Sequence, residues 1–231
     1  MSPVTKLILF DIDGTLVLTG GAGLRAMRHA FRDVFSLSHE FDIPMGGRTD
    51  AWIVAKAAER YGFTYNDVDL RRFHDVYVEH LSREVHEPGP RKGMMPGVRA
   101  LLDALAARND VYLALLTGNF EEGARIKLGY FDLWRYFQCG AFGDRIVERN
   151  DLLPLAFETV RARCGLDVPP EQTVIIGDTP LDVAVAVAGG ARSLAVATGS
   201  HSLEELSETG ADAVLSDLAD LDAALGALEL A

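Results

Sequence analysis

Hydrophobic and polar positions change abruptly near the start of the chain. Residues 7–10 form an apolar run that predicts a buried strand. Two carboxylates, Asp11 and Asp13, follow at once, and Gly14 and Thr15 come next. Because strand side chains alternate in direction, the two carboxylates are expected to project the same way and to repel each other. Such a pair needs a proton, a cationic side chain or a metal ion beside it.

The next part of the chain shows helical periodicity without a strand signal. Residues 44–50 form a turn, in which Thr49 or Asp50 is suited to cap the following helix. Residues 87–90, rich in proline and glycine, close the region because they do not continue a helix. The apolar spacing predicts helices over residues 24–35, 51–61 and 66–84. This region is therefore expected to form a small helical unit.

From residue 96 onward the pattern alternates between helix and strand. Helices are expected over residues 96–107, 121–128, 153–164 and 180–188, and strands over 111–116, 137–141, 173–176, 193–197 and 213–215. Such alternation predicts an α/β fold with a mostly parallel sheet and helices on both faces. We expect residues 1–18 and 92–231 to form this core, and residues 19–91 to form the inserted helical unit.

Polar clusters follow three of the predicted strands directly. They are residues 11–15, residues 117–119 (Thr-Gly-Asn) and residues 177–179 (Gly-Asp-Thr). In open parallel sheets, ligands bind beyond the carboxyl ends of the strands. We therefore expect these clusters to meet at one edge of the sheet, where the helical unit also leaves the core and can cover it.

Composition narrows the function. The 231 residues carry a net charge of −12 and are 48% hydrophobic, which indicates a compact globular protein without the basic patches that bind nucleic acid. No apolar run is long enough to span a bilayer, and residues 1–6 lack the pattern of a signal peptide, so a cytoplasmic protein without membrane partners is expected. The two cysteines are too few and too isolated for a disulfide framework or a thiolate metal site.

The acidic residues suggest a type of chemistry. Asp178 or Thr179 can cap the helix that starts at Pro180, and Asp182 adds a further acid. Together with the two aspartates of the first cluster, these residues offer hard oxygen ligands, which suits Mg²⁺ rather than zinc. Magnesium beside a carboxylate at a strand end indicates phosphoryl transfer, with the carboxylate as a possible nucleophile. The hydroxyl of Thr117 and the backbone N–H groups of residues 118 and 119 are suited to hold phosphate oxygens.

The motifs resemble those of the haloacid dehalogenase-like superfamily of hydrolases, specifically its phosphatases. Residues 11–15 match DxDGT, residues 115–119 match an apolar strand that ends in Thr, and residues 177–182 match GDxxxD. The resemblance covers residues 6 to about 217 and implies a Rossmann-like core with an inserted α-helical cap of the first type. Within the family, the length and the compact cap look most like phosphoglycolate phosphatase and its relatives.

The resemblance implies a role for each matched residue. Asp11 would be the nucleophile and a Mg²⁺ ligand. Asp13 would act as general acid and then general base, and would bind Mg²⁺ through its carbonyl oxygen. Asp178 would be a further Mg²⁺ ligand, supported by Asp182 directly or through water. The substrate phosphate would contact residues from the first two motifs, namely Thr15, Thr117, Gly118 and Asn119.

The third motif departs from the family pattern, which places a lysine before the helix that precedes the GDxxxD strand. Residues 144–151 contain no lysine. Arg149 is the first choice as its substitute because it lies closest to the start of the helix, and Arg145 is the second. Arginine keeps the charge but differs from lysine in geometry. In the helical unit, Arg48 is a candidate anion contact, with a plain interhelical turn as the alternative.

The sequence thus predicts a Mg²⁺-dependent phosphatase that hydrolyses a small phosphomonoester, such as phosphoglycolate, through an aspartyl-phosphate. Two alternatives remain open at this point. One is a transferase resembling β-phosphoglucomutase, which would pass the phosphoryl group to a sugar. The other is a noncatalytic, phosphate-binding regulatory protein, which the missing lysine favours and the four acidic residues oppose.

Overall fold

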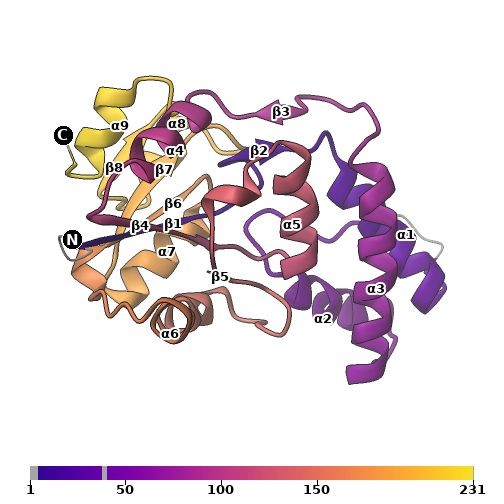
Figure 1. Ribbon diagram of the computed structural model, residues 1–231. Helices are drawn as coiled ribbons and strands as arrows, with labels where there is room; N and C mark the ends of the chain where they lie inside the picture. Colours follow the sequence, from indigo (N-terminus) through magenta and orange to yellow (C-terminus); the bar gives the residue numbers. More distant parts are fainter. Residues whose placement is uncertain (1–4, 38–40, 231) are drawn as a thin grey trace.

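The computed structural model describes residues 5–37 and 41–230, so residues 1–4 of the N-terminal segment lie outside the described part. Within these ranges, six parallel strands form the main sheet, in the order β5-β4-β1-β6-β7-β8 (Figure 1). The strands are β1 (Lys6–Phe10), β4 (Val111–Leu116), β5 (Gly140–Ala141), β6 (Thr173–Gly177), β7 (Arg192–Val196) and β8 (Ala213–Leu215). The predicted α/β class with a parallel sheet is confirmed.

The central strand β1 is buried on both faces. Ile8 and Phe10 pack in a cluster with residues of α4 (Val98–Ala106), α5 (Glu121–Tyr130) and α9 (Leu221–Ala227). Leu7 and Leu9 pack on the opposite face, in a cluster with residues of α6 (Leu152–Cys164) and α7 (Pro180–Gly189). Helices therefore cover both faces of the sheet, as expected from an uninterrupted apolar strand. A further short helix, α8 (Leu203–Ser207), packs beside β7 through Leu206.

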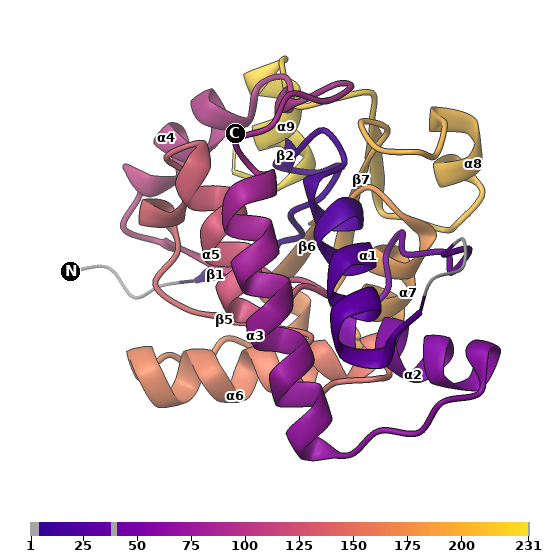
Figure 2. The ribbon, with the colours of Figure 1, turned by 90° about the vertical axis from the view of Figure 1, so that its right-hand side faces the viewer.

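The helical insertion stands to one side of the sheet (Figures 1 and 2). It contains α1 (Ala22–Phe35), α2 (Asp50–Tyr61) and α3 (Asp67–Glu84), with an apolar cluster of its own that includes Met27, Phe31 and Phe73. The chain leaves and re-enters the core through two short antiparallel strands, β2 (Val17–Leu18) and β3 (Gly93–Met94). The predicted helical insertion is confirmed, whereas its expected limits at residues 19 and 91 remain a prediction.

Some elements differ from the expectation. The predicted strand over residues 137–141 is shorter, because residues 134–136 form a 3₁₀ turn and only Gly140–Ala141 pair with β4. The strands β2 and β3 and the helices α8 and α9 were not predicted, since segments of two to seven residues show little periodicity. No helix within the described ranges combines the length and the apolar character needed to cross a membrane.

The start of α2 binds the insertion to the core. Its N-cap is Thr49, whose Oγ accepts the N–H of Trp52 at 3.1 Å. The backbone N–H of Asp50 donates to the carbonyl of Gly118 at 2.7 Å, and its buried carboxylate accepts the N–H of Phe120 at 2.8 Å. Phe120 belongs to the core domain but packs in the apolar cluster of the insertion. Hydrogen bonds and apolar contacts therefore hold α2 against the loop after β4.

We expect Asp50→Ala to lower the free energy of unfolding by about 1–3 kcal/mol, because the buried N–H of Phe120 would lose its acceptor. Asp50→Asn keeps an acceptor oxygen and should cost less. Urea denaturation followed by circular dichroism measures both. Equal losses in the two variants would contradict this assignment of the hydrogen bond.

Comparison of the wild type with Asp50→Asn shows how much the charge of Asp50 contributes to the free energy of unfolding. Burial raises the pKa of Asp50 to about 7, against the opposing effect of Lys127. The folded protein therefore favours the protonated carboxyl between about pH 4, the pKa of an unfolded aspartate, and about pH 7. Over this window the free energy of unfolding of the wild type should fall relative to that of Asp50→Asn as the pH rises.

Candidate active site

The polar clusters that follow β1, β4 and β6 meet at the carboxyl edge of the sheet. Asp11, Asp178 and Asp182 are buried, and each offers a carboxylate oxygen within 4.8 Å of the others. Thr15, fully buried, donates from its hydroxyl to Asp178 Oδ1 at 3.2 Å. The strand ends therefore bring together residues that are more than 160 positions apart in the sequence.

The local fold around Asp178 leaves its carboxylate free to face the cluster. Thr179, rather than Asp178, is the N-cap of α7, and its backbone N–H and hydroxyl both donate to Asp182 Oδ2, at 3.1 and 2.7 Å. Gly14 and Gly199 lie so close to Asp178 that a Cβ on either would collide with its carboxylate. The turn at Gly14, whose φ is +89°, also needs glycine for its backbone conformation.

Arg149 is the cation that contacts this carboxylate cluster. It begins a 3₁₀ turn before α6 and is buried, with Nη2 2.5 Å from Asp182 Oδ1 and 3.2 Å from Asp11 Oδ1. Its buried Nε has no hydrogen-bond partner among the described residues. Arg145, the second choice from the sequence, is exposed. The structure thus places Arg149, and not Arg145, beside the carboxylate cluster, whereas its role as the substitute for the third-motif lysine and its catalytic role remain predictions.

Burial governs the electrostatics of the cluster. It raises the pKa of Asp11 to about 6, although the charge of Arg149 opposes the shift. It also raises the pKa of Asp178 to about 8, assisted by the charges of Asp11 and Asp182. The pKa of Arg149 is raised because the two carboxylates outweigh its loss of water. Arg149 contacts Asp11 and Asp182 but not Asp178, so the three carboxylates favour a further positive charge at the site.

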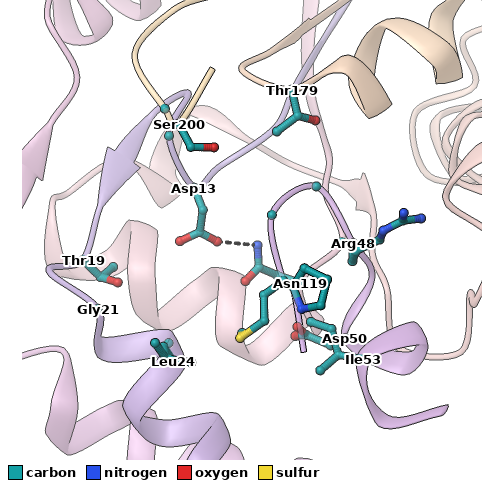
Figure 3. Close-up of a pocket in the computed structure, with 18 of the residues that line it drawn as sticks. Asp13, Thr19, Gly21, Leu24, Arg48, Asp50, Ile53, Asn119, Thr179 and Ser200 are labelled. Carbon is teal, nitrogen blue, oxygen red and sulfur yellow. Dashed lines mark hydrogen bonds between the residues drawn. The ribbon is translucent and has the colours of Figure 1, made fainter. Parts of the chain in front are cut away.

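Asp13 is held apart from this cluster, on the side of α5. Its Oδ2 accepts from Asn119 Nδ2 at 2.9 Å, as Figure 3 shows, and from Lys127 Nζ at 2.5 Å. Lys127 is buried and also donates to Asn119 Oδ1 at 2.6 Å. The two acids of the first motif are therefore paired with different cations, which limits the repulsion expected between them.

The remaining predicted site residues have distinct positions. The Thr117 hydroxyl donates to Asp11 and accepts from Asn119 Nδ2 at 2.8 Å. Gly118 has no room for a side chain. A Cβ at this position would collide with the backbone carbonyl of Arg48 and would lie 3.0 Å from Arg149 Nη1. The guanidinium of Arg48 lies over the ring of Trp52, 4.4 Å from its centroid, and points away from Asp13 in Figure 3. Its predicted role as an anion contact stays a prediction.

Several of the predicted site residues line a cavity of about 560 Å³ between the core and the insertion. Asp11, Asp13 and Asp178 contribute to its walls, as do Gly118, Asn119, Lys127 and Arg149. Most ligand pockets in proteins have volumes of roughly 300–1,000 Å³. The cavity can therefore hold an organic molecule with one end against the carboxylates.

Lys127 and Asp50 were not identified from the sequence. Lys127 lies four residues after Gly123, so both lie on one face of α5, and Asn119 lies just before the start of this helix. That spacing was the available signal. The spacing alone does not show that α3 covers this face of α5. In the structure, the ring of Tyr77 on α3 lies against Gly123, 3.1 Å from the position that a Cβ would take there. Burial of Lys127 therefore depends on packing between segments far apart in the sequence.

Comparison with known proteins identifies the family. A model of the haloacid dehalogenase-like hydrolases matches residues 5–190. The chain belongs to this family. The family match agrees with the resemblance based on the DxDGT, Thr-Gly-Asn and GDxxxD segments, which follow one another in this order along the chain.

Individual relatives of this haloacid dehalogenase-like hydrolase include phosphatases. Phosphoglycolate phosphatase from Rhodospirillum rubrum is 32% identical over 226 residues, which are 96% of this chain and 91% of that protein. The crystal structure of CbbY from Rhodobacter sphaeroides in complex with phosphate superposes with a TM-score of 0.71 at 24% identity and covers 94% of this chain and 96% of that one. A putative β-phosphoglucomutase from Thermotoga maritima gives a TM-score of 0.60 at 21% identity, covering 96% and 99%. The two structural comparisons show a shared fold.

We expect Arg149→Met to lower the free energy of unfolding by about 3–5 kcal/mol at pH 8, because it leaves buried carboxylates without their cation. The loss should be smaller at pH 5, since Asp11, whose pKa burial raises to about 6, can then take up a proton in the folded state. Urea denaturation with a chelator present measures the effect.

Arg145→Met is the matched control, because it removes the same charge from an exposed position. Its effect should stay within about 0.5 kcal/mol. Equal losses in both variants, or a loss in Arg149→Met that does not change with pH, would contradict the pairing.

Proposed function

We propose that this hydrolase is a Mg²⁺-dependent phosphomonoesterase that acts on a small phosphorylated metabolite through an aspartyl-phosphate. The observation that carries the proposal is the separate pairing of two neighbouring acids, Asp11 with Arg149 and Asp13 with Lys127, at the end of one cavity. This arrangement provides a nucleophile and an acid–base group at adjacent positions. The named phosphatase relatives support the same reaction class.

The acidic cluster fits a magnesium ion. Asp11, Asp178 and Asp182 supply hard oxygen donors close together, and the raised pKa values of Asp11 and Asp178 indicate that a cation would stabilise their ionised forms. The close approach of Gly14 and Gly199 keeps side chains away from Asp178. When bound, Mg²⁺ would neutralise charge on the phosphoryl oxygens. These three aspartates, with the backbone carbonyl of Asp13, are the proposed ligands.

Asp11 is the proposed nucleophile. Its carboxylate oxygen forms a bond to phosphorus while the bond from phosphorus to the ester oxygen breaks, which leaves an acyl phosphate on Asp11. Arg149 contacts the same carboxylate and has a free buried Nε among the described residues, so it can hold Asp11 ionised and bind an equatorial phosphoryl oxygen. The Thr117 hydroxyl, which donates to Asp11, orients the carboxylate for attack.

Asp13 is the proposed acid and base. Protonated Asp13 gives its proton to the departing alcohol oxygen, and the resulting carboxylate then takes a proton from the water that attacks the acyl phosphate. Water oxygen bonds to phosphorus, the bond between phosphorus and Asp11 breaks, and both aspartates return to their starting forms. Lys127 and Asn119 orient Asp13 throughout, because both contact the same carboxylate oxygen.

The transferase alternative uses the same acyl phosphate, with a sugar hydroxyl in place of water as acceptor. The structural likeness to a putative β-phosphoglucomutase supports it only at the level of the fold. The regulatory alternative was based on the missing lysine. The contact of Arg149 with Asp11 supports Arg149 as the substitute for that lysine and therefore counts against the regulatory alternative.

We expect Asp11→Asn to reduce hydrolysis of p-nitrophenyl phosphate at least about a thousandfold, about 4 kcal/mol of barrier, while circular dichroism shows an intact fold. A chelator should abolish wild-type activity, and added Mg²⁺ should restore it.

A rapid acid quench with substrate labelled in its phosphate tests the covalent intermediate. Label should be found on Asp13→Asn protein, because hydrolysis of its acyl phosphate is slowed, and no label should be found on Asp11→Asn protein.

Substrate panels separate the alternatives. Release of inorganic phosphate without isomerisation of sugar phosphates would exclude the transferase. Wild-type protein that is inactive toward phosphoglycolate, sugar phosphates, nucleotides, pyrophosphate and aryl phosphates would contradict the phosphatase.

We expect Lys127→Met to lower kcat at least about tenfold for an alkyl phosphate, with a smaller effect on KM, because Asp13 would lose one of the two donors that orient its carboxylate. The loss should be smaller for p-nitrophenyl phosphate, whose leaving group needs little protonation. Arg125→Met, on an exposed face of the same helix, is the control and should leave both rates near wild type. Equal losses for the two substrates would contradict a role through Asp13.

A further inference from the structure

The two cysteines of the chain, which are far apart in the sequence, lie together in the structure. Cys139 comes directly before β5, and Cys164 is the last residue of α6. Both side chains contact the hydroxyl of Tyr112 on β4, whose oxygen is 3.7 Å from Cys139 Sγ and 2.6 Å from Cys164 Sγ. Both cysteines are free thiols. The fold therefore gathers two oxidisable groups around one hydroxyl.

The two thiols also interact with each other. Burial raises the pKa of the Cys139 thiol to about 11, a hydrogen bond with Tyr112 opposes the shift, and a hydrogen bond with the Cys164 thiol adds to it. A disulfide requires its sulfurs to approach to about 2.05 Å, so only neighbouring side chains can form one without movement of the backbone. Thiols that share a hydrogen bond meet this first requirement.

The backbone holds both cysteines in place. The carbonyl of Cys139 accepts the N–H of Leu115 on β4 at 3.1 Å. Gly165, with a φ of +67°, ends α6 just after Cys164, and its N–H donates to the carbonyl of Arg161 at 3.0 Å. Helix α6 runs beside β5 (Figure 1). Because regular elements fix both residues, each thiol meets the other as an intramolecular partner, which favours bond formation between them.

The thiols differ in exposure. Cys139 is buried, with 5% of its surface exposed, whereas Cys164 is half-buried at the end of its helix. Arg163, the residue before Cys164, is exposed and adds positive charge beside the pair. Thiol–disulfide exchange begins at the thiol that a reagent can reach, and a nearby cation favours its thiolate form. Cys164 is therefore the thiol that reacts first, and Cys139 is placed to react second.

We propose that Cys139 and Cys164 form a redox modification site, at which a low-molecular-weight disulfide converts the two thiols into an intramolecular disulfide bond. Cys164 gives up its proton, and its sulfur attacks one sulfur of the reagent, whose S–S bond breaks to release one thiolate. Cys139 then gives up its proton and attacks Cys164 Sγ, which displaces the second thiolate. The two cysteines are oxidised, the reagent is reduced, and the two released protons leave it as two thiols.

The bond would enclose a segment that matters to the candidate active site. Residues 140–163 contain β5, the 3₁₀ turn with Arg149 and most of α6. Arg149 contacts the carboxylates beyond the carboxyl ends of the strands, whereas Cys164 lies at the opposite end of α6. The disulfide would thus hold this segment against the sheet without touching the carboxylate cluster. A covalent link between its ends would restrict the unfolded chain and stabilise the folded protein.

Mass spectrometry of the intact protein after incubation with oxidised glutathione tests the proposal. The wild type should lose the mass of two hydrogen atoms and retain no glutathione, and a non-reducing digest should contain the peptides of Cys139 and Cys164 joined together. Dithiothreitol should restore the original mass. An unchanged mass, glutathione retained on both cysteines, or disulfides between two chains would overturn the proposal.

Single substitutions test the order of reaction. Cys139→Ser should retain one glutathione on Cys164, because the second thiol is missing. Cys164→Ser should be modified at least about tenfold more slowly, because the remaining thiol is buried. If Cys139→Ser is poorly folded by circular dichroism, Cys139→Ala replaces it with the same expected result. Equal rates of modification in the two variants would overturn the assignment of Cys164 as the first thiol.

Urea denaturation measures the effect on stability. The midpoint of the oxidised wild type should lie at least about 0.5 M above that of the reduced protein. Cys139→Ser treated in the same way is the matched control, and its midpoint should not rise. An unchanged midpoint in fully oxidised wild type would overturn the stabilising effect. These measurements do not use phosphatase activity, so they stand or fall independently of the proposed function.

Discussion

Negative charge buried at the ends of parallel strands is the constraint on which this structure depends. The sheet brings Asp11 and Asp178 to one edge and takes them out of water, so each needs a compensating group that its own strand does not provide. Arg149 reaches Asp11 from the turn before α6, and the hydroxyl of Thr15 donates to Asp178 from the segment after β1. The close loop packing around the site follows from this need, because a buried carboxylate without a partner costs several kcal/mol.

The sequence predicted those parts of the site that follow from a local pattern. An apolar strand followed by a carboxylate located Asp11 and Asp178, and the topology of parallel sheets placed them together. It left open whether Asp178 or Thr179 caps α7, because both residue types suit that position. The structure resolves the choice through the hydrogen bonds of Thr179 with Asp182, which leave Asp178 to the cluster.

Other residues of the candidate site are positioned by packing between segments far apart in the sequence, so local sequence patterns could not predict them. Arg145 and Arg149 both precede α6, and only the 3₁₀ turn at Arg149 directs a guanidinium toward Asp11. The buried positions of Asp50 and Lys127 result from the contact of the helical insertion with α5 and the loop after β4. In a predicted amphipathic helix, a charged residue is normally assigned to solvent. The residues that join the insertion to the core were therefore the ones that sequence patterns did not identify.

The central position of β1 in the sheet also sets an order on folding. Its hydrogen-bonding partners are β4 and β6, which begin more than 100 and more than 160 residues later in the chain. During synthesis, β1 therefore has no strand partner until residue 116 has been made, and it lacks its second partner until residue 177 has been made. The helices of the insertion contact one another over short sequence distances and can associate earlier. A nascent chain thus carries a largely formed helical unit beside an exposed apolar strand, which is a state that needs protection from aggregation.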